Sequence, residues 1–233
     1  MGKMIEIAAL DDEGDIPAYL AEPAGAPRGA IIVIQEIFGL TAGIRRKTDD
    51  WATHGYLAIA PEMFWRFAPG FDADPDVPEQ LEQAMALRTR FDMDKAVADV
   101  EAAIRHARVL LPAGGKVGVV GFCWGGSIAY LAATRTDADA SVGYYGRQIT
   151  DYLGEAHAIA RPLLLHFGEA DPSIPAGMRA AVRVALDANP RVAIHDYAGA
   201  GHGFAASFGK RRNEDAAAAA DRRTEAFFAQ HLQ

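Results

Sequence analysis

The residues best able to do chemistry together are a cysteine, an aspartate and a histidine. Cys123 is the chain's single cysteine, and it stands in Gly121-Phe122-Cys123-Trp124-Gly125 between a predicted strand and a predicted helix. The pattern G-x-S-x-G, with cysteine here in place of serine, is typical of a nucleophile elbow. The amino terminus of the following helix favours a thiolate. A lone cysteine is more often a buried structural residue, but the elbow context reverses that preference.

The order of the candidates along the chain supports the same chemistry. Hydrolases with such an elbow have the order nucleophile, acid, histidine, and Cys123, Asp171 and His202 follow that order. His202 stands between two glycines, where the backbone is free to present the imidazole. Asp171 alone could be a turn residue before a proline. Together the three predict a nucleophile, an orienting acid and a base. Six other histidines compete with His202: His54, His106, His157, His166, His195 and His231. Of these, His54, His106 and His231 lie in or at the ends of predicted helices, and His166 and His195 lie within predicted strands.

A fourth candidate is the carboxylate of Glu36, in Gln35-Glu36-Ile37-Phe38-Gly39. It follows a predicted central strand, where hydrolases with this kind of elbow place half of the oxyanion hole. On spacing alone, a functional carboxylate and a solvated loop glutamate are equally well supported.

These side chains need elements that bring them together, and the chain predicts strands alternating with helices. Such alternation favours an α/β fold with a mostly parallel sheet and helices on both faces, whose ligands bind at the carboxyl ends of the strands. Each of the four candidates follows a predicted strand. The predicted strands are Lys3–Ala9 and Ile16–Glu22, as a hairpin, then Ala30–Gln35, Tyr56–Ala60, Lys116–Gly121, Ala140–Tyr145, Pro162–Phe167 and Arg191–Tyr197. Four helical segments are predicted. They are Ile44–Thr53, Val77–Leu111 as two helices, a helix that begins with Gly125–Ala133, and Asn213–Leu232.

Composition and charge exclude several other classes of protein. The 233 residues are 50% hydrophobic, and the net charge is −8. An acidic chain is unsuited to nucleic-acid phosphates, and one cysteine cannot make an intrachain disulfide. We find no signal peptide and no apolar run near the ~20 residues that span a membrane. We therefore expect one domain over residues 1–233, in the cytoplasm, without a nucleic-acid or membrane partner, as a monomer or small homo-oligomer.

The motifs taken together resemble the dienelactone hydrolase family over nearly the whole chain. They are Gln35-Glu36-Ile37-Phe38-Gly39, Ala68-Pro69-Gly70, Phe91-Asp92-Met93, Gly121-Phe122-Cys123-Trp124-Gly125-Gly126, Gly143-Tyr144-Tyr145-Gly146 and Ala200-Gly201-His202-Gly203-Phe204-Ala205. The resemblance implies an α/β-hydrolase fold with Cys123 as nucleophile, His202 as base and Asp171 as its orienter. It also implies that Glu36 takes the thiol proton when substrate arrives.

The resemblance and the residues lead to one expected mechanism. In the resting enzyme the Cys123 thiol is turned away from His202, and substrate binding moves Glu36 so that it accepts the thiol proton. The thiolate attacks an ester or lactone carbonyl and forms a thioester. The backbone N–H groups of Ile37 and Trp124 hold the oxyanion, and His202 then activates water. No metal and no cofactor are expected.

The expected substrate differs from dienelactone. Family members that open dienelactone bind its carboxylate with two arginines, and the matching positions here are Leu81 and Ala206. The pocket is therefore expected to accept neutral or apolar esters, unless another cation substitutes: Arg88, Arg90, Lys210 or Arg211. Six residues are candidates for the pocket wall: Phe38, Trp65, Met85, Arg88, Tyr145 and Phe204.

Two rival classes, a nucleotide-binding module and a metal hydrolase, fit the sequence poorly. The glycines around the elbow match neither G-x-G-x-x-G nor a P-loop, and neither H-E-x-x-H nor a cysteine cluster is present for a metal. Two alternatives stay open. One is a hydrolase of the same fold acting on other activated acyl or phosphoryl esters. The other, less well supported, is a non-catalytic ligand-binding α/β protein.

Overall fold

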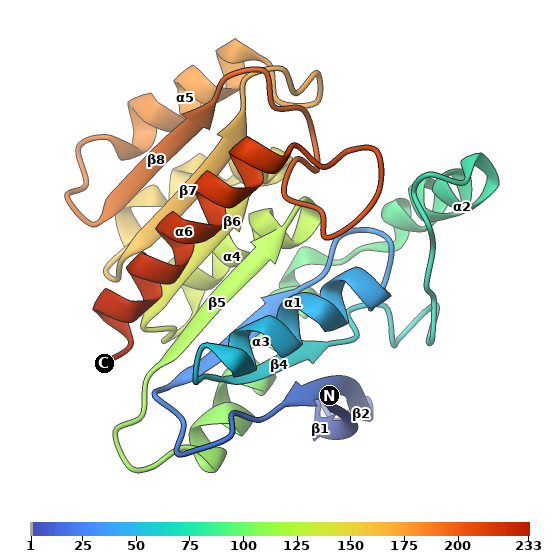
Figure 1. The fold of residues 1–233 in the computed structure, drawn as a ribbon, viewed down its shortest axis with the longest axis vertical. Helices are drawn as coiled ribbons and strands as arrows, with labels where there is room; N and C mark the ends of the chain where they lie inside the picture. The colour runs from blue at the N-terminus through green and yellow to red at the C-terminus, as the bar shows by residue number, and fades with distance from the viewer. Residues whose placement is uncertain (1) are drawn as a thin grey trace.

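An eight-stranded sheet runs through the protein (Figure 1). The computed structural model describes residues 2–233. The strands are β1 (Lys3–Ala8), β2 (Asp15–Ala21), β3 (Ala30–Ile34), β4 (Leu57–Pro61), β5 (Val117–Phe122), β6 (Ala140–Tyr144), β7 (Leu163–Gly168) and β8 (Val192–Tyr197). They lie in the order β1-β2-β4-β3-β5-β6-β7-β8. β2 pairs antiparallel with β1 and β4, and the other neighbours pair parallel.

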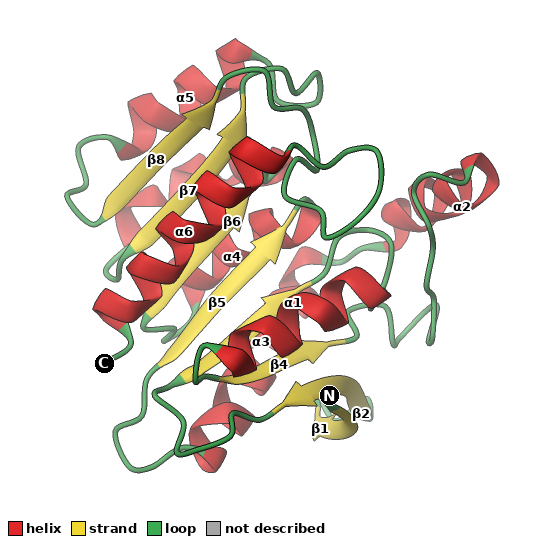
Figure 2. Cartoon of the chain, in the orientation of Figure 1, coloured by secondary structure: helices red, strands yellow, loops and turns green. Residues whose placement is uncertain are grey.

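Helices cover both faces of this sheet (Figure 2). They are α1 (Ala42–Thr53), α2 (Pro78–Leu87), α3 (Met93–Leu110), α4 (Trp124–Arg135), α5 (Ala176–Leu186) and α6 (Glu214–His231), with 3₁₀ helices η1 (Arg88–Arg90) and η2 (Arg147–Ala158). α1 and α6 share one face, where Trp51 meets Phe228 edge to face. α3 and α4 pack together on the other face. The predicted α/β class, with a mostly parallel sheet, is confirmed.

The central strands form because apolar residues continue along their whole length. Every residue of β3, β5 and β7 is buried, as expected for parallel strands covered on both faces. The edge strand β8 buries only Tyr197 fully. This burial fixes the sheet, and the polar residues that follow its strands are left at its carboxyl edge.

Two elements, α5 and η2, are absent from the sequence predictions. α5 buries only Val182 and Leu186 fully, and Val184 is 87% exposed. Val182 and Leu186 stand four residues apart, at helical spacing, so the sequence carries a signal for α5 that the prediction missed. η2 is irregular, with a non-helical residue at Tyr152.

The carboxyl ends of the parallel strands meet at one edge of the sheet. Cys123 directly follows β5, Glu36 is the second residue after β3, and the loops after β7 and β8 carry Asp171 and His202. The topology alone therefore gathers the four sequence candidates. Among residues 2–233, no helix is both long enough and apolar enough to cross a membrane.

Candidate active site

The turn at Cys123 is as tight as a turn between a strand and a helix can be. β5 ends at Phe122 and α4 begins at Trp124, so Cys123 alone makes the connection. Its φ is 56°, in the left-handed region that residues with a side chain rarely adopt. A Cβ atom on Gly121 would overlap the carbonyl of Gly125, and one on Gly125 would approach the Gln35 carbonyl to 2.5 Å. The two glycines of G-x-C-x-G are therefore required by the close approach of backbone segments.

The structure brings Cys123, His202 and Asp171 into direct contact. His202 Nε2 lies 3.0 Å from Cys123 Sγ, and His202 Nδ1 lies 2.7 Å from Asp171 Oδ2. The Asp171 side chain is fully buried, and its other oxygen accepts a hydrogen bond from the Ser173 N–H at 2.8 Å. The aspartate is thus held from both sides and holds the imidazole in turn.

Electrostatics at this contact favour a charged imidazole. Burial opposes the charge, but the neighbouring Cys123 thiolate and the Asp171 carboxylate outweigh it and raise the pKa of His202 to about 10. Burial likewise opposes the charge of Asp171, but its hydrogen bond with His202 prevails and lowers the pKa of Asp171. The group can therefore hold a proton on His202 beside a thiolate sulfur.

One expectation about this group is wrong. The resting thiol was expected to turn away from His202, yet Sγ lies within hydrogen-bond distance of the imidazole. The physical reason is that buried Asp171 holds His202 in place beside the sulfur, within hydrogen-bond reach of Sγ.

Glu36 is held by an arginine from the loop before α6. Arg211 Nη2 lies 2.9 Å from Glu36 Oε2, and Arg211 Nη1 lies 3.3 Å from Glu36 Oε1. The guanidinium also lies 4.9 Å from the Phe38 ring. Burial opposes the charge of Arg211, but the Glu36 carboxylate prevails and raises the pKa of Arg211. Of the four cations predicted as substitutes, Arg211 is the one paired with Glu36.

The two predicted oxyanion donors lie where backbone segments approach each other. Gly125 of α4 contacts the end of β3 at Ile34 and Gln35, which brings Ile37 and Trp124 to the same corner of the sheet. Within the described chain, neither the Ile37 N–H nor the Trp124 N–H donates to a protein acceptor. Both groups are available to an oxyanion.

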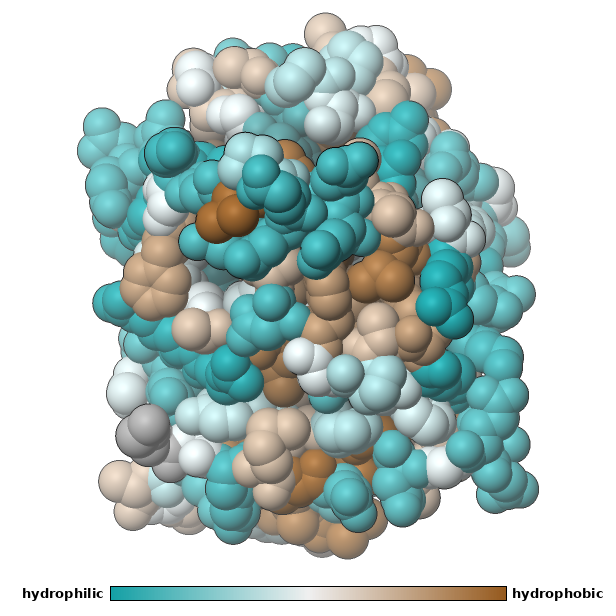
Figure 3. Space-filling model, turned by 90° about the vertical axis from the view of Figure 1, so that its right-hand side faces the viewer, coloured by the Kyte–Doolittle hydropathy of each residue, from teal (hydrophilic) through white to brown (hydrophobic). Residues whose placement is uncertain are grey.

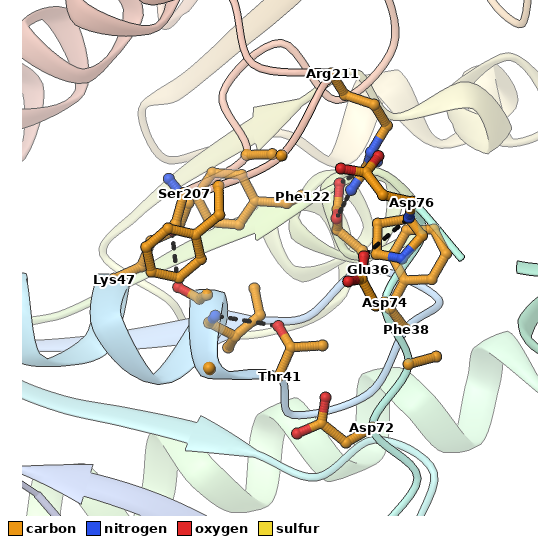
Figure 4. Close-up of a pocket in the computed structure, with 18 of the residues that line it drawn as sticks. Glu36, Phe38, Thr41, Lys47, Asp72, Asp74, Asp76, Phe122, Ser207 and Arg211 are labelled. Atoms are coloured by element: carbon orange, nitrogen blue, oxygen red, sulfur yellow. Dashed lines mark hydrogen bonds and ion pairs between the residues drawn. The ribbon is translucent and has the colours of Figure 1, made fainter. Parts of the chain in front are cut away.

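A cavity of about 300 Å³ adjoins these residues (Figure 4). Of the predicted pocket residues, Phe38 and Tyr145 line it, as does Ala206. Cys123 and His202 do not line it, but the Tyr145 ring lies 5.2 Å from the His202 ring. Glu36 and Tyr145 line the cavity, and Tyr145 also contacts His202, so the cavity lies close to the reacting groups.

The other four predicted pocket residues do not line this cavity, and their contact with substrate stays a prediction. Trp65 donates to buried Asp99 at 3.0 Å, and Phe204 is a fully buried support beneath the Tyr145 ring, 5.3 Å away. Met85 is 41% exposed, and Arg88 is also exposed. Leu81 and Met85 belong to α2, which stands out from the body of the protein (Figure 1).

Two residues of the cavity wall, Lys47 and Phe122, are missing from the sequence predictions. Phe122 immediately precedes the nucleophile position, and Lys47 lies on α1 rather than after a strand. Helical spacing could have identified Lys47, because it stands three residues after Ile44 and four before Trp51, which are buried. Over residues 2–233, no group of three or more His, Cys, Asp or Glu side chains could hold a metal ion.

The face of the protein that includes α2 has mixed polarity. Figure 3 shows hydrophobic residues there in small groups between hydrophilic ones. A substrate that approaches from this side therefore meets both polar and apolar surface.

Comparison with known proteins agrees with this geometry. Residues 16–232 match the sequence profile of the dienelactone hydrolase family. The carboxymethylenebutenolidase of Pseudomonas putida is 40% identical over 212 residues, which cover 91% of this chain and 90% of that protein. Carboxymethylenebutenolidase 1 of Cupriavidus pinatubonensis is 36% identical over 211 residues, which cover 91% and 90%.

Solved structures show the same fold. A Klebsiella pneumoniae protein assigned provisionally to the dienelactone hydrolases has a TM-score of 0.86 at 30% identity, and the match covers 99% of this chain and 98% of that one. A dienelactone hydrolase-like promiscuous phosphotriesterase from metagenomic libraries has a TM-score of 0.77 at 19% identity, with 100% and 99% covered. The predicted resemblance and the α/β-hydrolase fold are confirmed. The chain therefore belongs to the dienelactone hydrolase family.

Proposed function

We propose that the protein hydrolyses carboxylic esters or lactones through a thioester on Cys123. The observation that carries the proposal is the chain of contacts from Sγ to His202 at 3.0 Å and from His202 to Asp171 at 2.7 Å. A nucleophile, a base and an orienting acid within hydrogen-bond reach are what covalent acyl transfer requires. The family's hydrolase activity supports the same reaction class.

The proposed reaction has two steps. The thiol proton passes to His202, Sγ bonds to the carbonyl carbon, and the leaving oxygen takes the proton from the imidazolium as its bond to carbon breaks. Water then gives a proton to neutral His202 and attacks the thioester, and the acid leaves as the thiol is restored. The N–H groups of Ile37 and Trp124 stabilise the oxyanion in both steps, and losing one such donor typically costs ~3 kcal/mol.

Glu36 enters the scheme as a second acceptor for the thiol proton. It is paired with Arg211 at 2.9 Å, so substrate must first separate the two. Once released, the carboxylate can accept the thiol proton and return it to the leaving oxygen, so that His202 is neutral for the water step. Arg211, released at the same time, can pair with an acidic group on the substrate.

The substrate preference is proposed to differ from that of dienelactone hydrolysis. Position 206 in the cavity wall is alanine, and Leu81 is 38% exposed on α2, so neither position supplies a cation. We expect 4-nitrophenyl acetate to be hydrolysed with a kcat/KM at least equal to that for dienelactone. A strong preference for dienelactone would contradict the proposed shift.

Replacing the nucleophile tests the reaction class. Cys123→Ala should lose more than about 10³-fold in kcat on 4-nitrophenyl acetate, because the covalent step has no other nucleophile. Circular dichroism would establish that the variant is folded. Ester hydrolysis by folded Cys123→Ala at the wild-type rate would overturn the proposal.

Replacing Glu36 tests the proton step separately. Glu36→Gln keeps the size of the side chain but cannot take a proton, so acylation measured by stopped flow should slow by about 10²-fold. The deacylation rate of the same variant is an internal control and should change little. Unchanged acylation would show that His202 alone accepts the thiol proton.

A further inference from the structure

A buried glutamine lies between the end of β3 and Glu36. Gln35 is fully buried, and burying a side-chain amide costs free energy unless its polar atoms find hydrogen-bond partners. Its Oε1 accepts a hydrogen bond from the Met63 N–H at 3.1 Å, and its Nε2 donates to the Glu36 carbonyl oxygen at 3.4 Å. Both partners are backbone groups, so this one side chain joins two segments of the chain.

The orientation of the amide is fixed by these partners. A backbone N–H can only donate, so the amide atom that faces Met63 must be the oxygen. The amide nitrogen therefore faces the Glu36 carbonyl, which can only accept. Met63 is the second residue after β4, the strand that pairs with β3, so the amide is anchored at the end of the neighbouring strand.

The Glu36 carbonyl belongs to the same peptide unit as the Ile37 N–H. In a planar trans peptide the C=O and N–H point in opposite directions, and no peptide bond within residues 2–233 is cis. Because Gln35 holds the carbonyl on its own side, the Ile37 N–H points to the other side. That N–H is one of the two donors of the proposed oxyanion hole.

The backbone of Gln35 contacts the segment that carries the other donor. A Cβ atom on Gly125 would lie 2.5 Å from the Gln35 carbonyl oxygen, so the first turn of α4 packs directly on this residue. Trp124, whose N–H is the second donor, immediately precedes Gly125. Gln35 therefore connects the two segments whose N–H groups would stabilise the oxyanion.

We propose that Gln35 is a positioning residue, which sets the plane of the peptide between Glu36 and Ile37 so that the Ile37 N–H points at the oxyanion. The proposal rests on the proposed function and adds a residue that does not line the cavity. A donor held in advance needs no reorganisation when charge develops on the substrate oxygen. The same hydrogen bond keeps the backbone of Glu36 in place when its carboxylate separates from Arg211.

Removing the amide tests this role against a matched control. Gln35→Met keeps the length of the side chain and removes both hydrogen bonds. Asn189→Leu is the control, because the Asn189 amide also joins two backbone groups, the Ile159 carbonyl and the Arg191 N–H, each at 3.0 Å, near the start of β8. Both variants should unfold at a lower urea concentration than the wild-type protein, but only Gln35→Met should react more slowly with 4-nitrophenyl acetate.

Two readouts separate positioning from stability. In stopped flow, the acylation rate constant of Gln35→Met should fall about tenfold with an unchanged half-saturating ester concentration, because the donor acts on the oxyanion rather than on the bound ester. The second readout uses 1,1,1-trifluoroacetone, whose ketone carbon bonds to the Cys123 thiolate while its carbonyl oxygen becomes an oxyanion. The pKa of that oxygen, followed by fluorine NMR, should be about one unit higher in Gln35→Met.

A second variant keeps the test valid if Gln35→Met does not fold. Gln35→Asn keeps an amide in the buried site but is one carbon too short for both contacts, so it should show the same slower acylation. A wild-type acylation rate and adduct pKa in a folded Gln35 variant, or equal slowing in Asn189→Leu, would overturn the proposal. Failure of the proposed function is distinguishable, because the wild-type protein itself would then show neither an acylation burst nor the adduct.

Discussion

At the scale of residues, the proposed chemistry depends on the proton of His202, whose binding is coupled to the charges of its two neighbours. His202 lies between Cys123 Sγ and Asp171 Oδ2, at 3.0 and 2.7 Å, and its charge is favoured only while both neighbours are negative. Residues that act as such a unit do not contribute additively. Removing either neighbour should therefore change the titration of the imidazole itself.

That titration can be measured directly. We expect NMR of labelled histidine to give His202 a pKa of about 10 in the wild-type protein and a clearly lower one in Cys123→Ala, where the thiolate charge is gone. The pKa of His202 is raised in the folded protein. Protonation of His202 therefore contributes fully to the free energy of unfolding at a pH below its pKa in the unfolded chain, about 6.5. This contribution is lost as the pH rises toward 10. A His202 pKa that is the same in both proteins would contradict the coupling.

The sequence predicts which residues meet here, but not how their side chains are oriented. Motif, chain order and strand ends are enough to select Cys123, Asp171 and His202. The pairing of Glu36 with Arg211 joins residues 175 positions apart, and no periodicity or motif relates them. Rotamers and long-range ion pairs depend on packing that local patterns do not contain.

At the scale of elements, the elbow depends on three backbone segments that touch. The carbonyl of Gly125 lies where a side chain on Gly121 would stand, and Gly126 leaves no room for a Cβ beside the Tyr144 carbonyl. β5, β6 and α4 are therefore packed backbone to backbone around Cys123. Precision at the nucleophile comes from this contact rather than from hydrogen bonds of its side chain.

A single methyl group should disturb that contact. Gly121→Ala is expected to cost about 2 kcal/mol or more of unfolding free energy in urea titrations, because rigid backbone must move to admit the Cβ atom. Its kcat should also fall, since the elbow shifts. Gly177→Ala in α5 is the matched control: nothing lies within 4 Å of its Cβ position, so no loss is expected, and a gain of up to about 1 kcal/mol because alanine favours the helix. Equal effects at the two sites would contradict the account.

The sequence predicts where strands and helices lie along the chain better than it predicts the directions in which they run in the fold. Runs of Ile and Val predict the buried strands, because parallel strands are apolar on both faces. The helix over 78–87 is also predicted, yet it projects outward, so Leu81 and Met85 miss the cavity. The direction of a helix depends on the loops around it, and apolar spacing says nothing about that.

At the scale of the whole molecule, buried hydrogen bonds tie α6 to the sheet. Thr224 lies 2.7 Å from the Tyr144 hydroxyl and 3.0 Å from His166 Nε2, and the Tyr197 hydroxyl lies 2.9 Å from His166 Nδ1. Burial lowers the pKa of His166 well below its ordinary value, so this imidazole is neutral. The network joins the ends of β6, β7 and β8, which hold Tyr145, Asp171 and His202 in register.

Removing one hydroxyl from this network should affect stability more than chemistry. Thr224→Val keeps the shape of the side chain but leaves buried groups of Tyr144 and His166 with fewer partners, so we expect a loss of about 1–3 kcal/mol in unfolding free energy. Thr53→Val on the exposed surface of α1 is the control and should change it by less than about 0.5 kcal/mol. An unfolding midpoint of Thr224→Val in urea equal to that of wild type would show that the network contributes nothing.

The central claim is that an acyl group is carried by Cys123, and trapping that group is the most direct test. Wild-type protein mixed with 4-nitrophenyl acetate and quenched with acid within the first turnover should gain one acetyl group, which peptide mass spectrometry places on Cys123 and hydroxylamine removes. Cys123→Ala should show neither the adduct nor the burst of nitrophenol. Steady turnover by the wild-type protein with no acyl group on Cys123 at any quench time would contradict the account.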